Sequence, residues 1–555
     1  MPGTRNLRML PADYADGISA PRLSKSGKAL PLPRTLSIEL SPNAEIFDKK
    51  FTLAAMEQGQ IVAHDITLVH APTRTSENQC CSKQGKLDKD YLNKSLCYPL
   101  IIPKDDPGYK DSGVECLNPF FRTITDLQNN CSTRGKAATQ LAIVTHVADL
   151  SLVYGSEDNV TNTLREKKGG RLVVETRNNH DWPPTVKEMY NLCNGTAHIC
   201  YRAGDSRINQ NPQLVVLQIM LLRDHNRIAD FLTKLNPHWS DEKTFEETRR
   251  ILIAKHQSIT YDEWLPTILG RENCYKNKLI YKTKDYVNDY DPSVDPSIFN
   301  EFTAAAFRSL HTLIAGNLKL AKENREFSNS SLKLGRLLFI PTDVEKGENF
   351  DDMARGLFTQ PQERADKYYN KEITLFLGRI TDKLGMDLRA FDIQRGRDHG
   401  LRPYVDYRTY CGLPKVLKWD DFLDLISFED VKKLSKLYET PADVDLAVGA
   451  SLEKNMPHSL VGPTFHCILT QQFLRTRIGD RFWYENGKCG TPFTLKQLKE
   501  IRKARISRII CDNGNDIKSI QLRGFEQVSE KNPLLKCEDI PSIDLSFWKE
   551  NTPEQ

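Results

Sequence analysis

The amino-acid sequence predicts a mainly α-helical protein that forms one large domain, with short β pieces and loops stapled by disulfides. Apolar residues recur every three or four positions, the period of an amphipathic helix, in residues 51–69, 211–235, 241–269, 296–314 and 372–384. Strand-like segments are scarce, and residues 171–175 are the main candidate. The chain also has 13 cysteines, several of them close together in the sequence, which is typical of disulfide-bonded loops.

The chain is expected to begin with an extended arm. Residues 1–45 show little helical periodicity and contain Pro21, Pro31, Pro33 and Pro42. We expect this arm to pack on a body formed by residues 46–550. Further along, Pro212 suits the first turn of the second helix, and Gly316 suits the end of the fourth.

The composition argues against nucleic acid as a partner and against a membrane span. Lys and Arg number 77 against 73 Asp and Glu, and no basic block or tail interrupts this near balance, which argues against nucleic acid. The longest apolar stretches, such as residues 214–222, fall well short of the roughly 18 residues that a membrane span requires. We therefore expect chemistry on small molecules and no membrane span.

Cysteines and glycosylation signals predict an oxidising, extracellular compartment. N-x-S/T sequons begin at Asn93, Asn130, Asn159, Asn194 and Asn329. Zinc is the competing use of cysteine, but neither a paired CxxC spacing nor HExxH occurs, which favours disulfides. The first residues, MPGTRNLRML, lack the apolar core of a signal peptide. With the odd cysteine count, this start leads us to expect a missing leader and a missing N-terminal cysteine, with Cys80 or Cys81 left unpaired.

Gln60 and His64, in GQIVAHDITL, lie four residues apart on the first predicted helix and therefore share one face, while Asp65 points about 100° away. A buried imidazole beside a glutamine can take a proton from a bound peroxide and return it to the departing oxygen. Without further context, the same pattern is more typical of a structural histidine.

Arg207, in AGDSRINQNP, precedes the helix start at Pro212, so its charge can be held rigidly at the mouth of that helix. There it could stabilise charge that develops on a leaving oxygen, although a capping or surface arginine gives the same pattern. His225, in LLRDHNR on the same helix, is the rival functional residue, and we interpret it as structural.

His311, in AFRSLHTLIAG, lies on an otherwise apolar predicted helix, where it shares a face with Phe307 and has Arg308 one turn before it. A lone imidazole in such a place suits ligation of haem iron. The alternative is a core histidine that is bonded to a backbone carbonyl.

The segment FDIQRGRDHG adds groups that would complement such a ligand. Asp392 could accept the other ring proton of a ligating histidine and make the iron more electron-rich. Arg395 and Arg397 could meet anionic haem propionates. Otherwise, RGRD is a solvated turn of ion pairs.

A candidate calcium site lies in THVADLSLVYGS. Thr145, Asp149 and Ser151 offer oxygens at spacings of two and four, with the carbonyl of Val147 between them, and hard cations prefer oxygen ligands. An Asx or Ser/Thr turn produces the same spacing without a metal.

Taken together and in this order, these segments resemble the animal haem peroxidases, the superfamily of myeloperoxidase, thyroid peroxidase and the insect chorion and cuticle peroxidases. The resemblance runs from LRMLPADYADGISAPR to LSFWKE and includes LVYGSE, LLRDHNRIAD, LNPHWSDE, ITYDEWLP, RSLHTLIAG, IQRGRDHGLRPY and RFWYEN. It covers nearly the whole chain and implies a single haem peroxidase domain.

The resemblance also implies a role for each candidate residue. His64 is the distal acid/base, Gln60 its neighbour on the water and substrate side, and Arg207 the distal cation. His311 is the proximal iron ligand. The haem propionates are held by Arg308 and Arg395. A calcium ion, which orients His64, is bound by Asp65, Thr145, Val147, Asp149 and Ser151. Asp392 stands where many members have Asn, which would strengthen the electron donation from the proximal side.

Two departures from the family pattern concern how the haem is held. Ala63 and Gln210 occupy the positions of the Asp and Glu that esterify the haem in many members, and neither side chain can form an ester. Asn211 replaces the methionine that the white-cell enzyme additionally links. We therefore predict a non-covalent haem b, which puts halide oxidation in doubt because covalent distortion is one determinant of redox potential.

The expected protein is thus a secreted peroxidase that reduces hydrogen peroxide and oxidises phenolic donors such as tyrosine or catechols, with radical cross-linking of matrix, cuticle or chorion proteins. An adhesion or immune protein with faded catalysis is the alternative, although the core residues are retained and no RGD or KGD occurs. A peroxidase portion of a membrane oxidase would need a partner segment. The expected disulfides are Cys116/Cys131, Cys193/Cys200, Cys411/Cys467, Cys511/Cys537, Cys97 with Cys80 or Cys81, and Cys274/Cys489.

Overall fold

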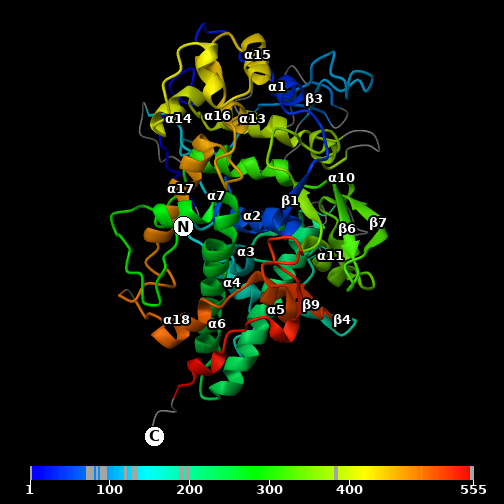
Figure 1. The fold of residues 1–555 in the computed structure, drawn as a ribbon, viewed down its shortest axis with the longest axis vertical. Coiled ribbons are helices and arrows are strands. Elements are labelled where there is room, and N and C mark those ends of the chain that lie inside the picture. The colour runs from blue at the N-terminus through cyan, green and yellow to red at the C-terminus, as the bar shows by residue number, and fades with distance from the viewer. Residues whose placement is uncertain are drawn as a thin grey trace.

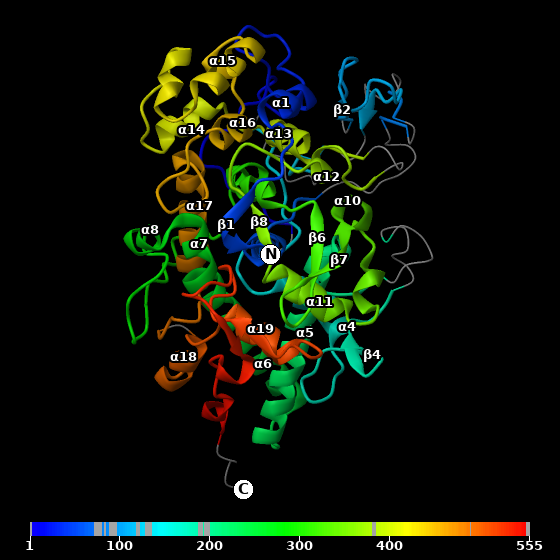
Figure 2. The same ribbon diagram turned by 45° about the vertical axis from the view of Figure 1, so that its right-hand side comes forward.

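The computed structural model describes residues 3–70, 80–82, 85–87, 97–117, 122–127, 136–186, 193, 200–379, 385–488 and 490–550. Helices make up most of the regular structure, and the strands of the described chain form only two-stranded antiparallel sheets, of which β1–β8 lies in the middle of the molecule beside α2 (Figure 1, Figure 2). The predicted mainly α fold with short β pieces is therefore confirmed.

Two long helices form the lower half of the molecule in Figure 1 and pack against each other. Helix α5 spans Pro212–Leu235, and the side chain of Asn211 caps it by accepting a hydrogen bond from the Leu214 N–H. Helix α6 spans Asp241–Ser258 and continues without a break through a π-helix, Ile259–Trp264, into α7, Leu265–Leu269. Both predicted helices are confirmed. Within the described chain, no helix combines the length and the apolar character needed to cross a membrane.

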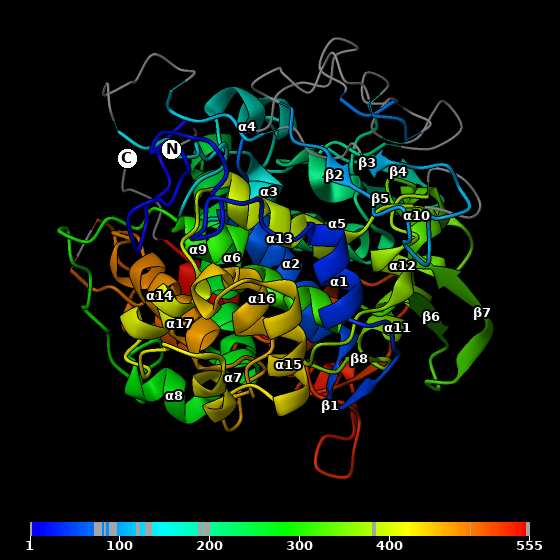
Figure 3. The same cartoon turned by 90° about the horizontal axis from the view of Figure 1, so that it is seen from above.

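Helix α2, Leu53–Ile66, lies in the interior of the molecule (Figure 3). It is shorter at both ends than predicted, because residues Phe47–Thr52 form strand β1, which pairs with β8, Pro361–Glu363. Twelve of its 14 residues are buried. Its polar side chains are consequently held in place by packing on all sides.

The predicted helix over residues 296–314 is wrong in its middle. Asn300–Ala304 form α9, Ala305 leaves the helical region at φ −139° and ψ −67°, and Ala306–Leu313 continue as a 3₁₀-helix, η4. The break lets Phe302 and Phe307 stack with their ring centroids 4.6 Å apart. With three residues per turn, residues i and i+3 of η4 point the same way, a geometry that apolar periodicity does not reveal.

Two further predicted elements differ from the structure. In place of a helix over residues 372–384, α12 covers only Lys371–Thr374, because Leu377 pairs with Met386 in an isolated β-bridge and residues 380–384 lie outside the described part. The predicted strand at 171–175 is displaced to β4, Glu175–Arg177, which pairs with β5, His180–Trp182. In both places tertiary pairing overrides local propensity.

The N-terminal segment contains a short helix, α1, Pro33–Leu40, that was not predicted. Arg34 on this helix forms ion pairs with Asp106 at 2.7 Å and with Asp387 at 2.6 Å, and all three side chains are buried. Arg22 forms an ion pair with Asp445 at 2.9 Å. These buried ion pairs fasten the segment to the rest of the molecule.

The remaining helices and strands surround these elements. They are β2 (Leu100–Ile101), β3 (Cys116–Leu117), α3 (Ser151–Tyr154), α4 (Asp158–Leu164), η2 (Ser206–Asn209), α8 (Arg271–Lys276), β6 (Asn317–Ala321), β7 (Phe327–Lys333), α10 (Leu334–Leu337), η5 (Pro341–Glu345), α11 (Asn349–Leu357), α13 (Leu388–Asp398), α14 (Tyr404–Tyr410), η6 (Trp419–Asp424), α15 (Phe428–Leu437), η7 (Pro441–Asp443), α16 (Leu446–Ser451), α17 (Pro463–Ile478), α18 (Leu495–Ile501), α19 (Ile506–Asn513), β9 (Ser519–Gln521), β10 (Leu534–Lys536), η8 (Cys537–Asp539) and η9 (Leu545–Trp548).

The disulfides confirm three predicted pairs, Cys193–Cys200, Cys411–Cys467 and Cys511–Cys537. Cys97 takes Cys80, one of its two expected partners. The predicted pair Cys116/Cys131 is wrong, because Cys116 bonds Cys81. The N–H groups of Glu115 and Cys116 donate to the carbonyl of Gly85, which brings the two cysteines together.

Neither Cys80 nor Cys81 is therefore unpaired, which corrects that expectation. Cys274 is buried and forms no disulfide within the described chain. Its expected partner Cys489 and the expected cysteine Cys131 lie outside the described residues, so the Cys274/Cys489 pair stays a prediction.

Candidate active site

Helix α2 and the η4 segment touch each other at a glycine. A Cβ on Gly59 would lie 2.6 Å from Cδ1 of Leu310 and 3.1 Å from Cζ2 of Trp264, closer than side chains normally approach. Gly59 directly precedes Gln60, and Leu310 directly precedes His311. The two segments that carry the predicted distal and proximal residues are therefore in contact at this point.

Replacing Gly59 with alanine is expected to lower the free energy of unfolding by about 1–3 kcal/mol, the usual cost of overpacking a core. Chemical denaturation followed by circular dichroism measures the change. Gly396→Ala in α13 is the matched control, because its Cβ would meet only Cδ1 of Leu401 at an ordinary 3.7 Å. Equal effects of the two substitutions would contradict the close approach.

His64 lies on α2 with only 6% of its surface exposed, and its Nδ1 has no hydrogen-bond partner among the described residues. Arg207, from η2, donates from Nη2 to the carbonyl of His64 and from Nη1 to the carbonyl of Thr67, both at 3.0 Å. Burial, together with the Arg207 charge, holds the pKa of His64 well below its usual value. The imidazole is therefore neutral at pH 7 and can accept a proton.

Asp205 holds Arg207 in this position, and sequence reasoning missed it. Its carboxylate accepts hydrogen bonds from Nη2 of Arg207 at 2.6 Å and from Nε at 3.0 Å. Burial would raise the pKa of Asp205, but the charge and hydrogen bonds of Arg207 outweigh it and the pKa lies below the usual value. The spacing D-x-R before a helix start is the signal that could have indicated this pair.

Gln60 belongs to a chain of side-chain amides beside His64. Its Nε2 donates to Oε1 of Gln210 at 3.2 Å, and its Oε1 accepts from Nδ2 of Asn211 at 3.0 Å. Gln210 and Asn211 stand at two of the positions where the family resemblance implies covalent haem links. Here their amide groups hydrogen-bond to Gln60.

Sequence reasoning also missed Glu57, which lies one turn before Gln60 on the same buried helix. Burial raises its pKa to about 8. Its Oε1 has no hydrogen-bond partner among the described residues. A glutamate directly after the apolar residues 53–56 was the available signal.

The η4 segment and α13 bring together the proximal residues. Nδ1 of His311 lies 2.7 Å from Oδ2 of Asp392, and Nη1 of Arg308 donates to Oδ1 of the same carboxylate at 3.2 Å. Arg308 and His311 reach one partner because a 3₁₀-helix places residues i and i+3 on one face. Nε2 of His311 makes no hydrogen bond within the described chain, which leaves it open for a ligand.

The pKa of Asp392 follows from the same contacts. Burial alone would raise this pKa, but the hydrogen bond and charge of His311 and the charge of Arg308 outweigh it, so the pKa lies below the usual value. The carboxylate is therefore ionised and accepts the hydrogen bond from Nδ1 of His311, so that Nε2 is the ring nitrogen that remains for a ligand.

The two arginines predicted to hold propionates differ in their surroundings. Arg308 is partly committed, since Nε donates to the carbonyl of Thr303 at 2.9 Å and Nη1 donates to Asp392. Arg395 is largely buried, with 15% of its side chain exposed, and burial lowers its pKa to about 9 although Asp398 lies 3.6 Å away. A largely buried cation of this kind would be stabilised by a bound anion.

The five predicted calcium residues also lie together. Oδ1 of Asp65 accepts from the N–H of Ser151 at 2.7 Å, and Oδ1 of Asp149 accepts from the hydroxyl of Thr145 at 2.7 Å. The carbonyl of Val147 accepts from the N–H of Asp149 at 2.9 Å. The remaining oxygen of Asp65, Oδ2, accepts no hydrogen bond among the described residues, and Nε2 of the buried His256 lies 3.5 Å from it.

The charges in this cluster fit a divalent cation. Burial and the charge of Asp65 raise the pKa of Asp149 to about 7, because two buried carboxylates repel each other. A calcium ion would relieve that repulsion and take Oδ2 of Asp65 as a ligand.

His225, the rival functional residue, has both ring nitrogens occupied. Nδ1 lies 2.8 Å from the hydroxyl of Tyr154, and Nε2 lies 2.9 Å from the carbonyl of Gly170. Neither nitrogen is open to a ligand, in agreement with the structural interpretation of this residue.

These features fit a protein that binds haem, and similarity to known proteins identifies its family. The family model of the animal haem peroxidases matches residues 1–525, so the chain belongs to this family. It is an oxidoreductase of the peroxidase type, and membership implies haem as the cofactor.

Individual relatives are similar over almost the whole chain. A peroxidase of Drosophila melanogaster is 47% identical over 98% of this chain and 79% of that protein. A chorion peroxidase of Drosophila melanogaster is 37% identical over 98% of this chain and 68% of that protein. Among solved structures, peroxidase A of Dictyostelium discoideum superimposes with a TM-score of 0.77 at 26% identity, covering 95% of this chain and 96% of that one.

Proposed function

We propose that this chain is a secreted peroxidase in which His64, Arg207 and Gln60 act on hydrogen peroxide on one side of a haem b, and His311 ligates the iron on the other side. The single observation that carries the proposal is the hydrogen bond between Nδ1 of His311 and Asp392, which leaves Nε2 as the ring nitrogen for a ligand. This is the arrangement that a ligating histidine needs.

The residues present fit a haem group. His311 would hold the iron through Nε2, and Arg308 and Arg395 would meet the propionates. When bound, haem would supply the redox chemistry, because hydrogen peroxide can oxidise it by two electrons and it can then oxidise two donors by one electron each. Ala63 and Gln210 offer no carboxylate for an ester, so the haem is held without covalent links.

The protein side chains move the proton and stabilise charge. The neutral imidazole of His64 takes a proton from one oxygen of the peroxide and returns it to the other oxygen, which leaves as water. The fixed guanidinium of Arg207 stabilises the negative charge that develops as the oxygen–oxygen bond breaks. The amide of Gln60 orients the peroxide or a water beside His64.

The physiological donor is proposed to be phenolic, either free tyrosine or catechol or the tyrosines of extracellular proteins, which the resulting radicals cross-link. The relatives named chorion peroxidases support this class of donor. Secretion is supported by the five disulfides within the described residues, since such bonds persist in oxidising compartments.

The test is an absorption spectrum of the haem-loaded protein before and after stoichiometric hydrogen peroxide, followed by extraction with acidic acetone. We expect a peroxide-dependent spectral change, oxidation of catechol, and complete extraction of the pigment. In the double variant Ala63→Asp, Gln210→Glu, part of the pigment should stay with the protein after exposure to peroxide.

Three outcomes would count against parts of this proposal. Retention of haem by the unmodified protein would contradict the non-covalent site. Haem binding without any response to peroxide would favour the adhesion or immune function. Failure to bind haem would contradict the proposed function as a whole.

Calcium removal is expected to destabilise the protein. A ligand present at about 100 times its dissociation constant stabilises the folded state by about 2.7 kcal/mol. We therefore expect a chelator to lower the calorimetric midpoint of unfolding, and excess Ca²⁺ to restore it. The variant Asp149→Asn should abolish this response, whereas the exposed control Asp158→Asn should keep it. A midpoint that is indifferent to the chelator would contradict the calcium site.

A further inference from the structure

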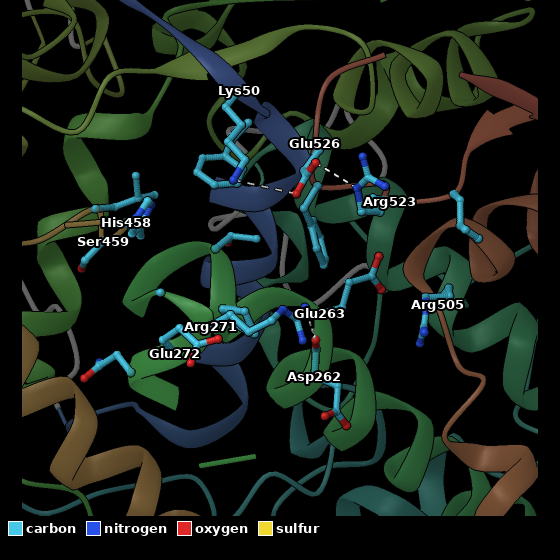
Figure 4. Close-up of a pocket in the computed structure, with 18 of the residues that line it drawn as sticks. Lys50, Asp262, Glu263, Arg271, Glu272, His458, Ser459, Arg505, Arg523 and Glu526 are labelled. Atoms are coloured by element: carbon cyan, nitrogen blue, oxygen red, sulfur yellow. Dashed lines mark hydrogen bonds and ion pairs between the residues drawn. The ribbon is translucent and has the colours of Figure 1, made fainter. Parts of the chain in front are cut away.

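A cavity of about 1000 Å³ opens beside the π-helix Ile259–Trp264, and its lining includes none of the residues assigned to the haem site (Figure 4). Charged side chains of both signs surround it, with Lys50, Glu526 and Arg523 on one side and Arg271, Glu272 and Asp262 on the other. Phe51, Pro266 and Phe525 supply apolar walls. The cavity is larger than a single side chain, and its mixture of apolar and charged groups suits a segment of polypeptide that carries a tyrosyl side chain.

One wall of this cavity contains a carboxylate bonded to a buried phenol. The hydroxyl of Tyr484 donates to Oδ2 of Asp262 at 3.0 Å, and only 3% of Tyr484 is exposed. Burial raises the pKa of Tyr484 well above its usual value, so the proton stays on the phenol in the resting protein. If the phenol loses an electron, its proton can pass directly along this hydrogen bond to the carboxylate.

Aromatic rings lead from Tyr484 into the core. The rings of Tyr484 and Trp483 lie 5.6 Å apart between centroids, and those of Trp483 and Tyr261 lie 4.6 Å apart. Phe473 packs against Tyr261 at 6.1 Å and against Trp264 at 6.1 Å. An electron can therefore cross the series in three steps, from Tyr484 to Trp483, from Trp483 to Tyr261, and from Tyr261 past the ring of Phe473 to Trp264.

The series ends between the two segments that carry the predicted haem-site histidines. The indole of Trp264 donates to the carbonyl of Ala55 on α2 at 2.7 Å, and its Cζ2 lies 3.1 Å from where a Cβ on Gly59 would be. Its ring also meets Phe307 on η4 at 6.2 Å. Trp264 thus touches both α2, which carries His64, and the segment that carries His311.

We propose that Tyr484 is a one-electron relay, through which a tyrosyl side chain of a polypeptide bound in this cavity is oxidised without reaching the haem. The inference rests on the proposed function, because the haem after reaction with peroxide is the oxidant. Tyr484 gives one electron to it through Trp483, Tyr261 and Trp264 and passes its phenolic proton to Asp262.

The donor then restores the relay. Its phenol returns one electron to Tyr484, Asp262 returns the proton, and the proton of the donor leaves to water, so the donor becomes a phenoxyl radical. Two such cycles supply the two electrons and two protons that convert one hydrogen peroxide to two waters. The phenols are oxidised and the peroxide is reduced, and no other reactant is needed.

The test compares Tyr484→Phe with Tyr438→Phe in the haem-loaded full chain. Tyr438 is the matched control because it is also a buried phenol that donates to a carboxylate, Asp445, at 2.8 Å, but it lies outside the aromatic series. Freeze-quench electron paramagnetic resonance after one equivalent of peroxide should show an organic radical in the unmodified protein. Ring-deuterated tyrosine should narrow that signal, Tyr484→Phe should abolish it, and Tyr438→Phe should retain it.

Donor size supplies the second measurement. Oxidation of a random glutamate–tyrosine copolymer should fall by about tenfold or more in Tyr484→Phe, whereas oxidation of free catechol at the haem should change by less than about twofold. The Tyr438→Phe control should resemble the unmodified protein with both donors. Equal radical signals and equal copolymer rates in the two variants would overturn the relay.

A second variant keeps the proposal open to failure if Tyr484→Phe does not fold. Trp483→Phe interrupts the series next to Tyr484 and removes an indole N–H that has no hydrogen-bond partner among the described residues, so it should also abolish the tyrosyl radical, and a retained radical would overturn the relay. A protein whose spectrum does not respond to peroxide would overturn the proposed function and the relay together. A normal spectral response without a radical at Tyr484 would overturn the relay alone.

Discussion

Replacing His64 with alanine is expected to lower the second-order rate constant for reaction with hydrogen peroxide by about a hundred- to ten-thousand-fold, the usual contribution of a positioned acid/base group. The reason is the neutral state of this buried imidazole, since burial and Arg207 hold its pKa well below the usual value. Without it, no described side chain at this position can take the proton from the peroxide and return it. Stopped-flow absorption in the haem region measures the rate constant.

The controls separate proton transfer from folding and haem binding. The absorption spectrum of the resting His64→Ala protein should still be that of a haem protein, because the alanine leaves His311 in place. His238→Ala removes an exposed histidine and should react with peroxide like the unmodified protein. A His64→Ala rate constant within a few fold of the unmodified value would contradict the assigned role.

Replacing His311 with glycine is expected to weaken haem binding more than any other single substitution at this site. Loss of an outer partner of a metal ligand typically costs about 10–100-fold in metal affinity, and loss of the ligand itself should exceed that. Titration of the apoprotein with haem, followed by absorption, measures the affinity. Added imidazole should restore part of the binding, because it can occupy the space that the side chain leaves and meet Asp392.

Asp392→Asn is the graded comparison for this prediction. Asparagine can still accept a hydrogen bond from Nδ1 of His311, but it has no negative charge to make the ligand electron-rich. We expect haem to stay bound and its reduction potential to rise. An unchanged potential would contradict the proposed electron donation from Asp392, and unchanged haem affinity in His311→Gly would contradict the ligand assignment.

Local sequence determined the long helices and the pairs of residues that lie within one turn. The apolar period and Pro212 in the first turn were sufficient for α5, and the spacing of Gln60 and His64 placed both on α2. The motifs and their order were sufficient to predict the family, and the family model confirms that prediction. Such features depend on residues that are a few positions apart, so the spacing along the sequence is sufficient to predict them.

Contacts between distant segments decided the rest. Stacking of Phe302 on Phe307 accompanies the break at Ala305, and the resulting 3₁₀ geometry lets Arg308 and His311 share Asp392. These residues are separated by 81 positions or more from their common partner. Helical periodicity reports the apolar positions but not which partner a distant segment brings.

The same holds for the cysteines and for the polar groups around Arg207. Proximity in sequence favoured Cys116 with Cys131, whereas backbone pairing at Gly85 brings Cys81 to Cys116. Arg207 is held by Asp205, two residues away, and by the carbonyl of His64, 143 residues away. The sequence by itself determined the helices, the family and the candidate residue types, whereas the tertiary structure decided their partners, because a pairing between distant residues depends on the three-dimensional path of the whole chain.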